Sequence, residues 1–363
     1  MMRSPRSFVV VCRRPDSTIV LKEARWVSLW DRLRFLRWPF LRGAVVFWET
    51  LQNGMQALTF SAEQQAGATP EEASSPPAGA TPADAGAPTP ASAATAEPPL
   101  SKGAITGTIL VSLLFAFGLF AALPHLLAFL TGKLTGAPLD GRNFLFQVVD
   151  GGFKLLVLVA YMWGVSRMKE IQRVFQYHGA EHKAIFTYEA GEPLTLEHAR
   201  KYRTFHPRCG TSFLILVLLV SILTFTLAFS GPWMPVFSEN QWLNQLLYVL
   251  IKLPLMFPIA GIAYEVLKLS GKRANQGWLK PLILPGLWLQ RITTKEPSDD
   301  QLEIALLSLR KVLWREQRIA AGDPLPPGAT GGFRDGQIEL LSTAAEADLP
   351  LVAGQLSAAA AHP

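Results

Sequence analysis

The chain has 363 residues, of which 49% are hydrophobic and only 17% are charged, and its formal net charge is +6. A soluble domain carries about 25% charged residues, so the composition argues against a soluble globular protein and favours a membrane protein. The two cysteines, Cys12 and Cys209, are too few for a disulfide framework and indicate a reducing compartment or incidental thiols.

Residues 1–61 predict a small β-hairpin followed by a basic amphipathic segment. Alternating apolar residues between 7 and 23, on both sides of Arg14-Pro15-Asp16-Ser17, indicate the hairpin. Further along, Trp, Phe and Leu are interleaved with Arg, which is typical of a helix at a membrane interface. We expect residues 29–47 to contact anionic lipid or a membrane-protein partner. Residues 62–99 are mainly Ala, Pro, Gly, Thr and Glu without periodicity, which predicts a disordered linker.

Four apolar stretches predict membrane spans, because a spanning helix needs about 20 apolar residues. They cover residues 104–132, 143–166, 212–233 and 244–267. Pro124 predicts a kink in the first span. Asp150 and Lys154 in the second are spaced to pair on one helix face, and Lys252 lies in the fourth. Charges inside a membrane are costly and functional by default, although Asp150 and Lys154 could lie shallower and simply pair.

The basic residues between the spans predict the orientation. Lys and Arg are frequent before the first span, rare in 133–142, frequent in 167–208, absent from 231–241 and frequent again after the fourth span. This alternation places both termini in the cytoplasm, together with the histidine-rich loop 167–211.

The C-terminal part predicts one more helix and a tail. Residues 299–318 have the apolar spacing of a packed amphipathic helix, whereas 321–363 are low in complexity and are expected to be disordered. The fold class is therefore mainly α. It is a polytopic membrane protein with about four transmembrane helices in a membrane domain at 100–320, a small N-terminal β-hairpin and amphipathic cytoplasmic helices.

The most specific chemical motif is His178-Gly179-Ala180-Glu181-His182. The surrounding residues predict a helix, and side chains four apart share one helix face, so both histidines can direct a ring nitrogen at one ion. Glu181 lies near that face and is a candidate general base. His-x-x-Glu-His is the ligand order of one class of zinc enzymes.

Further candidate ligands follow the motif. His206 and Cys209 lie in a Pro- and Gly-containing turn before the third span, and Glu265 is near the cytoplasmic end of the fourth. Histidine, cysteine and carboxylate ligands suit a divalent ion, with zinc as the expected metal. The alternative is a hydrogen-bonded structural cluster without metal, and His198 is expected to be a surface helix residue.

Several stretches of the chain resemble the YqhQ-like family of bacterial membrane proteins, a domain of unknown function. They include RVFQYHGAEHKAIFTYE, HPRCGTSFLILV, IAGIAYEVLKLSGK and PGLWLQRITTKEPSDDQLEIAL. The N-terminal stretches MMRSPRSFVVVCRRPDSTIV and RGAVVFWETLQNGMQALTFSA match as well. The resemblance implies a bacterial inner-membrane location and a metal-dependent enzyme. Family members usually begin with a glycine-rich stretch that ends in the two methionines, so we expect this sequence to be shortened.

Three functions are compatible with these residues. The first is a metal-dependent hydrolase at the cytoplasmic membrane surface, with Glu181 as the base and a lipid, lipid-linked molecule or membrane protein as substrate. The second is a membrane scaffold, or a membrane-protein insertion or quality-control factor, with a structural metal. The third is transport, with Asp150, Lys154 and Lys252 along a path. The bilayer is the expected partner, and nucleic acid is not expected.

Overall fold

The computed structural model describes residues 1–26, 28–29, 33–38, 41–65, 102–136, 142–207, 209–233, 235–272, 280–322, 337–344 and 349. The linker predicted at 62–99 lies outside the described residues, apart from 62–65, which end a helix. Most of the tail predicted at 321–363 lies outside them as well.

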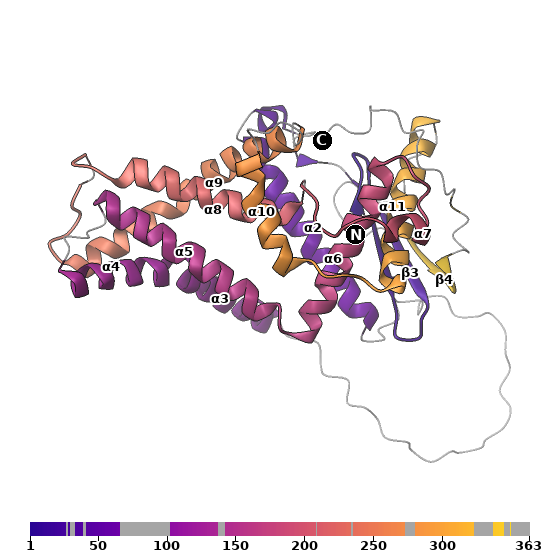
Figure 1. The fold of residues 1–363 in the computed structure, drawn as a ribbon, viewed down its shortest axis with the longest axis horizontal. Coiled ribbons are helices and arrows are strands. Elements are labelled where there is room, and N and C mark those ends of the chain that lie inside the picture. The colour runs from indigo at the N-terminus through magenta and orange to yellow at the C-terminus, as the bar shows by residue number, and fades with distance from the viewer. Residues whose placement is uncertain are drawn as a thin grey trace, which may run out of the picture.

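Within the described residues, four helical segments are long and apolar enough to cross a membrane, which confirms the predicted spans. They are Leu110–Thr135, Phe144–Val165, Gly210–Phe229 and Gln241–Leu269. The second and third are helices α5 (Phe144–Val165) and α8 (Gly210–Phe229), and the fourth lies within α9 (Gln241–Lys272). Figure 1 shows that these helices run side by side, with the remaining elements gathered at one end of the bundle.

The first span consists of two helices joined by a wider turn. Helix α3 (Lys102–Phe117) leads into a π-helical turn, η2 (Gly118–Ala122), and then into α4 (Leu123–Thr135). Pro124 is the second residue after this turn. Proline has no amide proton, and its ring clashes with the carbonyl four residues earlier, so the helix widens there. The kink predicted at Pro124 thus takes the form of a π-helical turn.

A four-stranded antiparallel sheet lies outside the bundle. Its strands are β1 (Met2–Arg3), β2 (Ser7–Arg13), β3 (Ile19–Arg25) and β4 (Gln337–Leu341), in that order across the sheet. Strands β2 and β3 form the predicted hairpin, and the turn between them contains Ser17 at φ 70°. Strand β4 falls within the tail that was predicted to be disordered. Its sequence, Gln-Ile-Glu-Leu-Leu, alternates polar and apolar residues over only four positions, and pairing with β3 holds it in the sheet.

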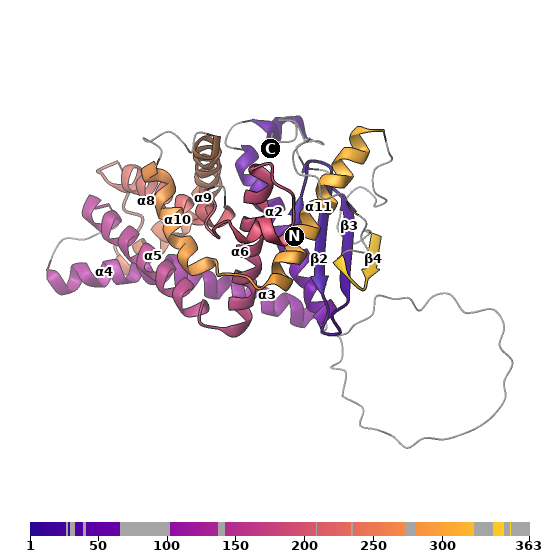
Figure 2. The same ribbon diagram turned by 45° about the vertical axis from the view of Figure 1, so that its right-hand side comes forward.

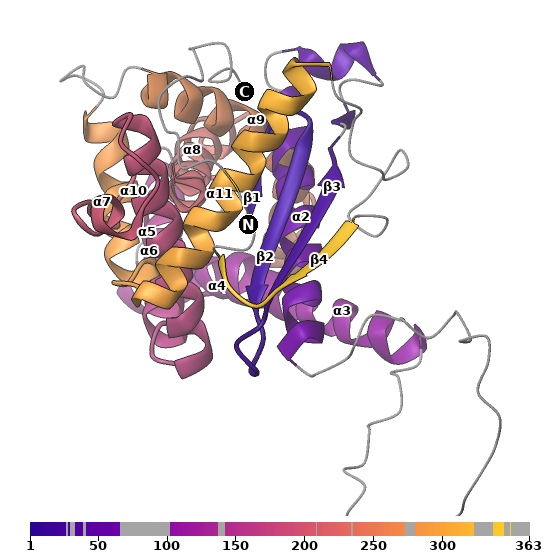
Figure 3. The ribbon, with the colours of Figure 1, turned by 90° about the vertical axis from the view of Figure 1, so that its right-hand side faces the viewer.

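The sheet is covered by one long helix on each face, as Figure 3 shows. Alternate residues of β2 point to opposite faces. Val9 and Val11 pack with helix α11 (Asp299–Ala320), and Phe8 and Val10 pack with helix α2 (Leu41–Gln65). Helix α11 is the predicted C-terminal amphipathic helix, and it begins at a capping box formed by Ser298 and Gln301.

The region predicted as a histidine-rich loop is largely helical. Helices α6 (Lys169–Glu189) and α7 (Leu196–Arg200) lie between the bundle and the sheet, and both contact α11. Helix α10 (Lys280–Thr293) packs against α8, as Figure 2 shows. A short 3₁₀ turn, η1 (Arg34–Arg37), precedes α2. The candidate ligands therefore lie where the membrane bundle meets the sheet and its helices.

Candidate metal centre

Helix α6 presents His178 and His182 on the same face, one turn apart. Their ring centroids are 4.4 Å apart. His178 Nδ1 lies 2.9 Å from the carbonyl oxygen of Thr293, at the end of α10, and His182 Nδ1 bonds to the carbonyl oxygen of Thr204. A carbonyl can only accept, so both Nδ1 atoms donate. In the neutral rings, Nε2 then carries the lone pair that binds metals.

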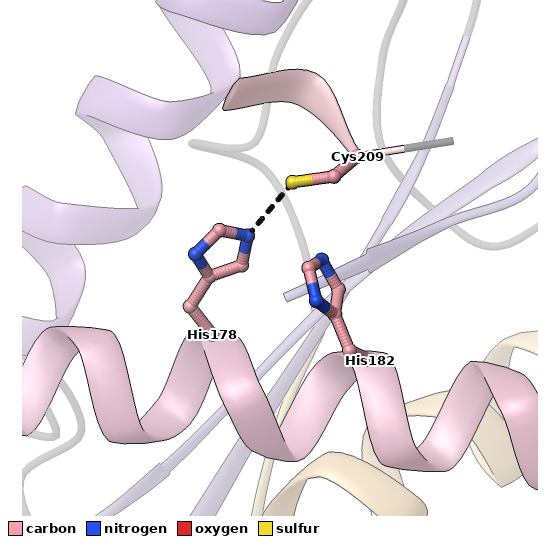
Figure 4. Close-up of side chains that lie close together, drawn as sticks. All are labelled: His178, His182 and Cys209. Carbon is pink, nitrogen blue, oxygen red and sulfur yellow. Dashed lines mark hydrogen bonds between the residues drawn. The ribbon is translucent and has the colours of Figure 1, made fainter. Parts of the chain in front are cut away.

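Cys209 comes to this face of α6 from the start of the third membrane span. It is the N-cap of α8, and its Sγ lies 3.1 Å from His178 Nε2 (Figure 4). Figure 4 shows both imidazole rings extending from α6 towards the cysteine. One ligand atom from each of His178, His182 and Cys209 lies within 4.8 Å of the other two.

The spacing of these ligand atoms is close to that of a zinc site. Zn–N bonds of about 2.0–2.1 Å and Zn–S bonds of about 2.3 Å place tetrahedral ligand atoms about 3.3–3.6 Å apart. The 3.1 Å between His178 Nε2 and Cys209 Sγ is slightly shorter. A zinc ion would therefore need the two side chains to separate by about half an ångström, which a change of side-chain torsion provides.

The electrostatics favour the ligand form of the cysteine. Burial opposes ionisation of Cys209, but hydrogen bonds and positive charge from His178 and His182 in their protonated form outweigh it and lower the pKa of the thiol to about 5. Burial also lowers the pKa of His178, but its hydrogen bonds to Cys209 and Thr293 and the negative charges of Cys209 and Glu181 together raise it. The amide of Thr211 donates to the sulfur at 3.4 Å. The partial positive charge at the N-terminus of α8 therefore also stabilises a thiolate at Cys209. A thiolate is the form of cysteine that binds metals.

The other predicted site residues have different partners. His206 is near, with its ring 5.7 Å from that of His182, but its Nε2 lies 3.2 Å from Glu189 Oε2. Glu265 accepts two hydrogen bonds from Arg42 of α2.

Glu181, the predicted base, is 31% exposed and accepts a hydrogen bond from the Met1 amine at 2.6 Å. It is still close enough to the candidate metal centre for its negative charge to act on His178.

Gly179 has no side chain that could act as a ligand, but it lets another segment of the chain approach helix α6. This role was not predicted from the sequence. A Cβ atom there would lie 2.1 Å from the carbonyl oxygen of Lys295, in the segment that follows Thr293. The Lys295 amide donates to Phe175 of α6 at 3.0 Å. The absence of a side chain lets this segment pass close enough for Thr293 to bond His178. A glycine inside a helix costs about 1 kcal/mol of stability relative to alanine. A glycine within a predicted helix is therefore itself a sequence signal of such a close approach.

Comparison with known proteins agrees with the resemblance found in the sequence. The family model described as "Protein of unknown function (DUF1385)" matches residues 38–315. "Uncharacterized protein YqhQ" of Bacillus subtilis (strain 168) is 34% identical over 282 residues, which cover 76% of this chain and 77% of that protein. No solved structure matches the chain. The match spans the four membrane helices and the cluster of His178, His182 and Cys209, and the chain belongs to the DUF1385 family of YqhQ-like proteins.

Proposed function

We propose that this membrane protein binds one divalent ion, preferentially zinc, through His178, His182 and Cys209. The observation that carries the proposal is the orientation of the two histidines. Both donate Nδ1–H to backbone carbonyls while the other side of the rings meets a buried cysteine of lowered pKa. Carbonyls that hold histidines in this way are characteristic of zinc sites, where they fix the tautomer and the ring orientation.

The ion would serve as the centre of a hydrolase. An ion held by three side chains keeps a fourth position for water or a substrate oxygen, and acts there as a Lewis acid. Cys209 directly precedes the membrane helix α8, which supports a position for the site near the surface of the bilayer. This position favours a lipid, a lipid-linked molecule or a membrane protein as substrate. The distribution of basic residues assigns the site and both termini to the cytoplasmic face of the bacterial inner membrane.

The segment before the bundle would contact lipid at the same level. Phe35 and Trp38 are 55% and 69% exposed, and both lie just before α2. Phe47 of α2 has its ring 5.6 Å from that of Phe213, in the first turn of α8. These contacts support residues 29–47 as an interfacial element whose aromatic side chains enter the headgroup region, next to anionic lipid.

The alternative is a scaffold or insertion factor with a structural metal. His206 favours it, because its ring is near that of His182 and a rotation away from Glu189 would offer a fourth ligand. A closed site with four protein ligands stabilises a fold and has no place for a substrate.

Metal content tests the proposal directly. Full-length protein, purified in detergent without chelator, should contain about one equivalent of zinc by elemental analysis. His178→Ala and Cys209→Ser should lose it. His198→Ala is the matched control, because His198 bonds Thr195 outside the site, and this variant should retain the metal. Wild-type protein that neither contains nor takes up zinc would disprove metal binding.

Cobalt substitution distinguishes the two functions. Azide should shift the visible spectrum of the cobalt-loaded protein if the fourth position is open, and His206→Ala should leave that spectrum unchanged. No response to azide, together with an altered spectrum in His206→Ala, would assign a closed site. Glu181→Gln should keep the metal and lose hydrolysis of a p-nitrophenyl ester. Equal hydrolysis by this variant would remove Glu181 from the mechanism.

A further inference from the structure

The membrane bundle contains a second cluster of ionisable side chains, separate from the metal centre. It consists of His125 of α4, Asp150 and Lys154 of α5, and Lys252 of α9. Lys154 is at the midpoint of α5, and the others lie within the inner part of their spans. All four side chains are at most 11% exposed. Ionisable groups at this depth are costly and typically occur where they function.

The cluster holds one carboxylate between two ammonium groups. Asp150 Oδ2 accepts from Lys154 Nζ at 2.7 Å and from Lys252 Nζ at 3.3 Å. Helix α8 has no titratable side chain, but its Phe225 ring lies 5.4 Å and 5.3 Å from the two ammonium nitrogens. The sequence from 103 to 124 has none either. With a neutral His125, the described groups of the cluster therefore sum to one uncompensated positive charge.

The opposite side of Asp150 has a vacant position for a proton. His125 Nε2 lies 2.8 Å from Gln245 Oε1 and donates to it, so Nδ1 of the neutral ring is an acceptor. This Nδ1 faces Asp150 Oδ1 at 3.8 Å. Neither atom has a hydrogen-bond partner within the described parts of the chain. The two acceptor atoms therefore face each other with no proton between them. The two neighbouring ammonium groups carry one more positive charge than Asp150 neutralises.

His125 also connects the cluster to a cavity. His125 and Gln245 are polar groups in the lining of a cavity of about 130 Å³, between aromatic side chains that include Phe117, Phe129 and Trp242. A cavity of about 10–15 Å³ is already large enough for one water molecule when polar groups line it. In a lining that is otherwise apolar, His125 and Gln245 supply two polar partners for a water molecule, and neither lysine is part of this lining.

We propose that His125, Asp150, Lys154 and Lys252 form a proton-binding site inside the membrane, which releases one proton to water in this cavity and takes it back. On release, an N–H bond of Lys252 or Lys154 breaks and the nitrogen keeps the electron pair. The proton passes to Asp150 and on to His125 Nδ1, and the Nε2 proton of the ring then leaves to form hydronium. The charge of the cluster falls from +1 to 0, which removes the uncompensated buried charge.

The charge count gives a test that does not depend on the metal centre. Removal of either lysine leaves one carboxylate and one ammonium, so Lys252→Met and Lys154→Met should lose the same exchangeable proton. Lys169→Met is the matched control, because Lys169 is exposed at the start of α6. A lysine in water has a pKa of about 10.4 and does not release its proton near neutral pH.

The measurement is a potentiometric titration of the full-length protein in detergent, with circular dichroism to confirm the fold of each variant. Between about pH 6 and about pH 9, wild type and Lys169→Met should release about one proton more per chain than Lys252→Met or Lys154→Met. If one lysine variant does not fold, the other gives the same comparison. Equal proton release by the wild type and a folded Lys252→Met or Lys154→Met variant would overturn the proposal.

Discussion

Gly179→Ala tests the geometry of the proposed metal centre without changing any of the proposed ligands. The new methyl group would lie 2.1 Å from the Lys295 carbonyl oxygen and 3.1 Å from Thr204 Cγ2. Both contacts are with segments that hold the histidines, since Thr293 bonds His178 and Thr204 bonds His182. The backbone at Lys295 must therefore move away from α6, which weakens the carbonyl contacts that orient the imidazole rings.

The expected loss can be worked out from these contacts. Loss of a hydrogen-bond partner that orients a metal ligand typically lowers the metal affinity by a factor of about 10–100. Because alanine favours a helix over glycine by about 1 kcal/mol, overpacking of about 1–3 kcal/mol is partly offset, and the protein should still fold. The assay is a zinc titration in competition with a chromophoric chelator. Gly152→Ala is the control, because no atom lies within 4 Å of its added Cβ. Equal zinc affinity in Gly179→Ala and the wild type would refute the reasoning.

Three further substitutions test the fold around the site. Glu23→Ala should destabilise the protein by about 3–5 kcal/mol in denaturant unfolding, because it would remove the buried carboxylate that accepts from Arg315 at 2.7 Å. Gly43→Ala should lower the melting temperature, since its Cβ would meet a tyrosine Cβ of α9 at 2.6 Å; Gly54→Ala on the same helix has no such neighbour and should not. Glu265→Gln should leave the zinc content unchanged, because this carboxylate bonds an arginine of α2; loss of zinc would place it among the ligands.

The sequence by itself determined the features that depend on local periodicity. A run of about 20 apolar residues predicts a membrane span whatever the rest of the chain does. The spacing of His178 and His182 likewise puts both side chains on one face of a helix. The hairpin turn at Arg14-Pro15-Asp16-Ser17 and the amphipathic pattern of α11 are local in the same sense. These predictions agree with the structure because neighbouring residues alone define them.

The tertiary structure decided which distant side chains meet. Cys209 reaches the histidines because it caps α8, whereas His206, three residues earlier, bonds Glu189. Glu265 has the chemistry of a ligand, but the packing of α2 against α9 pairs it with an arginine. Strand β4 and the contact between His125 and Asp150 likewise join segments that are far apart in the chain. The path of a loop and the packing of neighbouring helices fix such contacts, and no local pattern encodes either one.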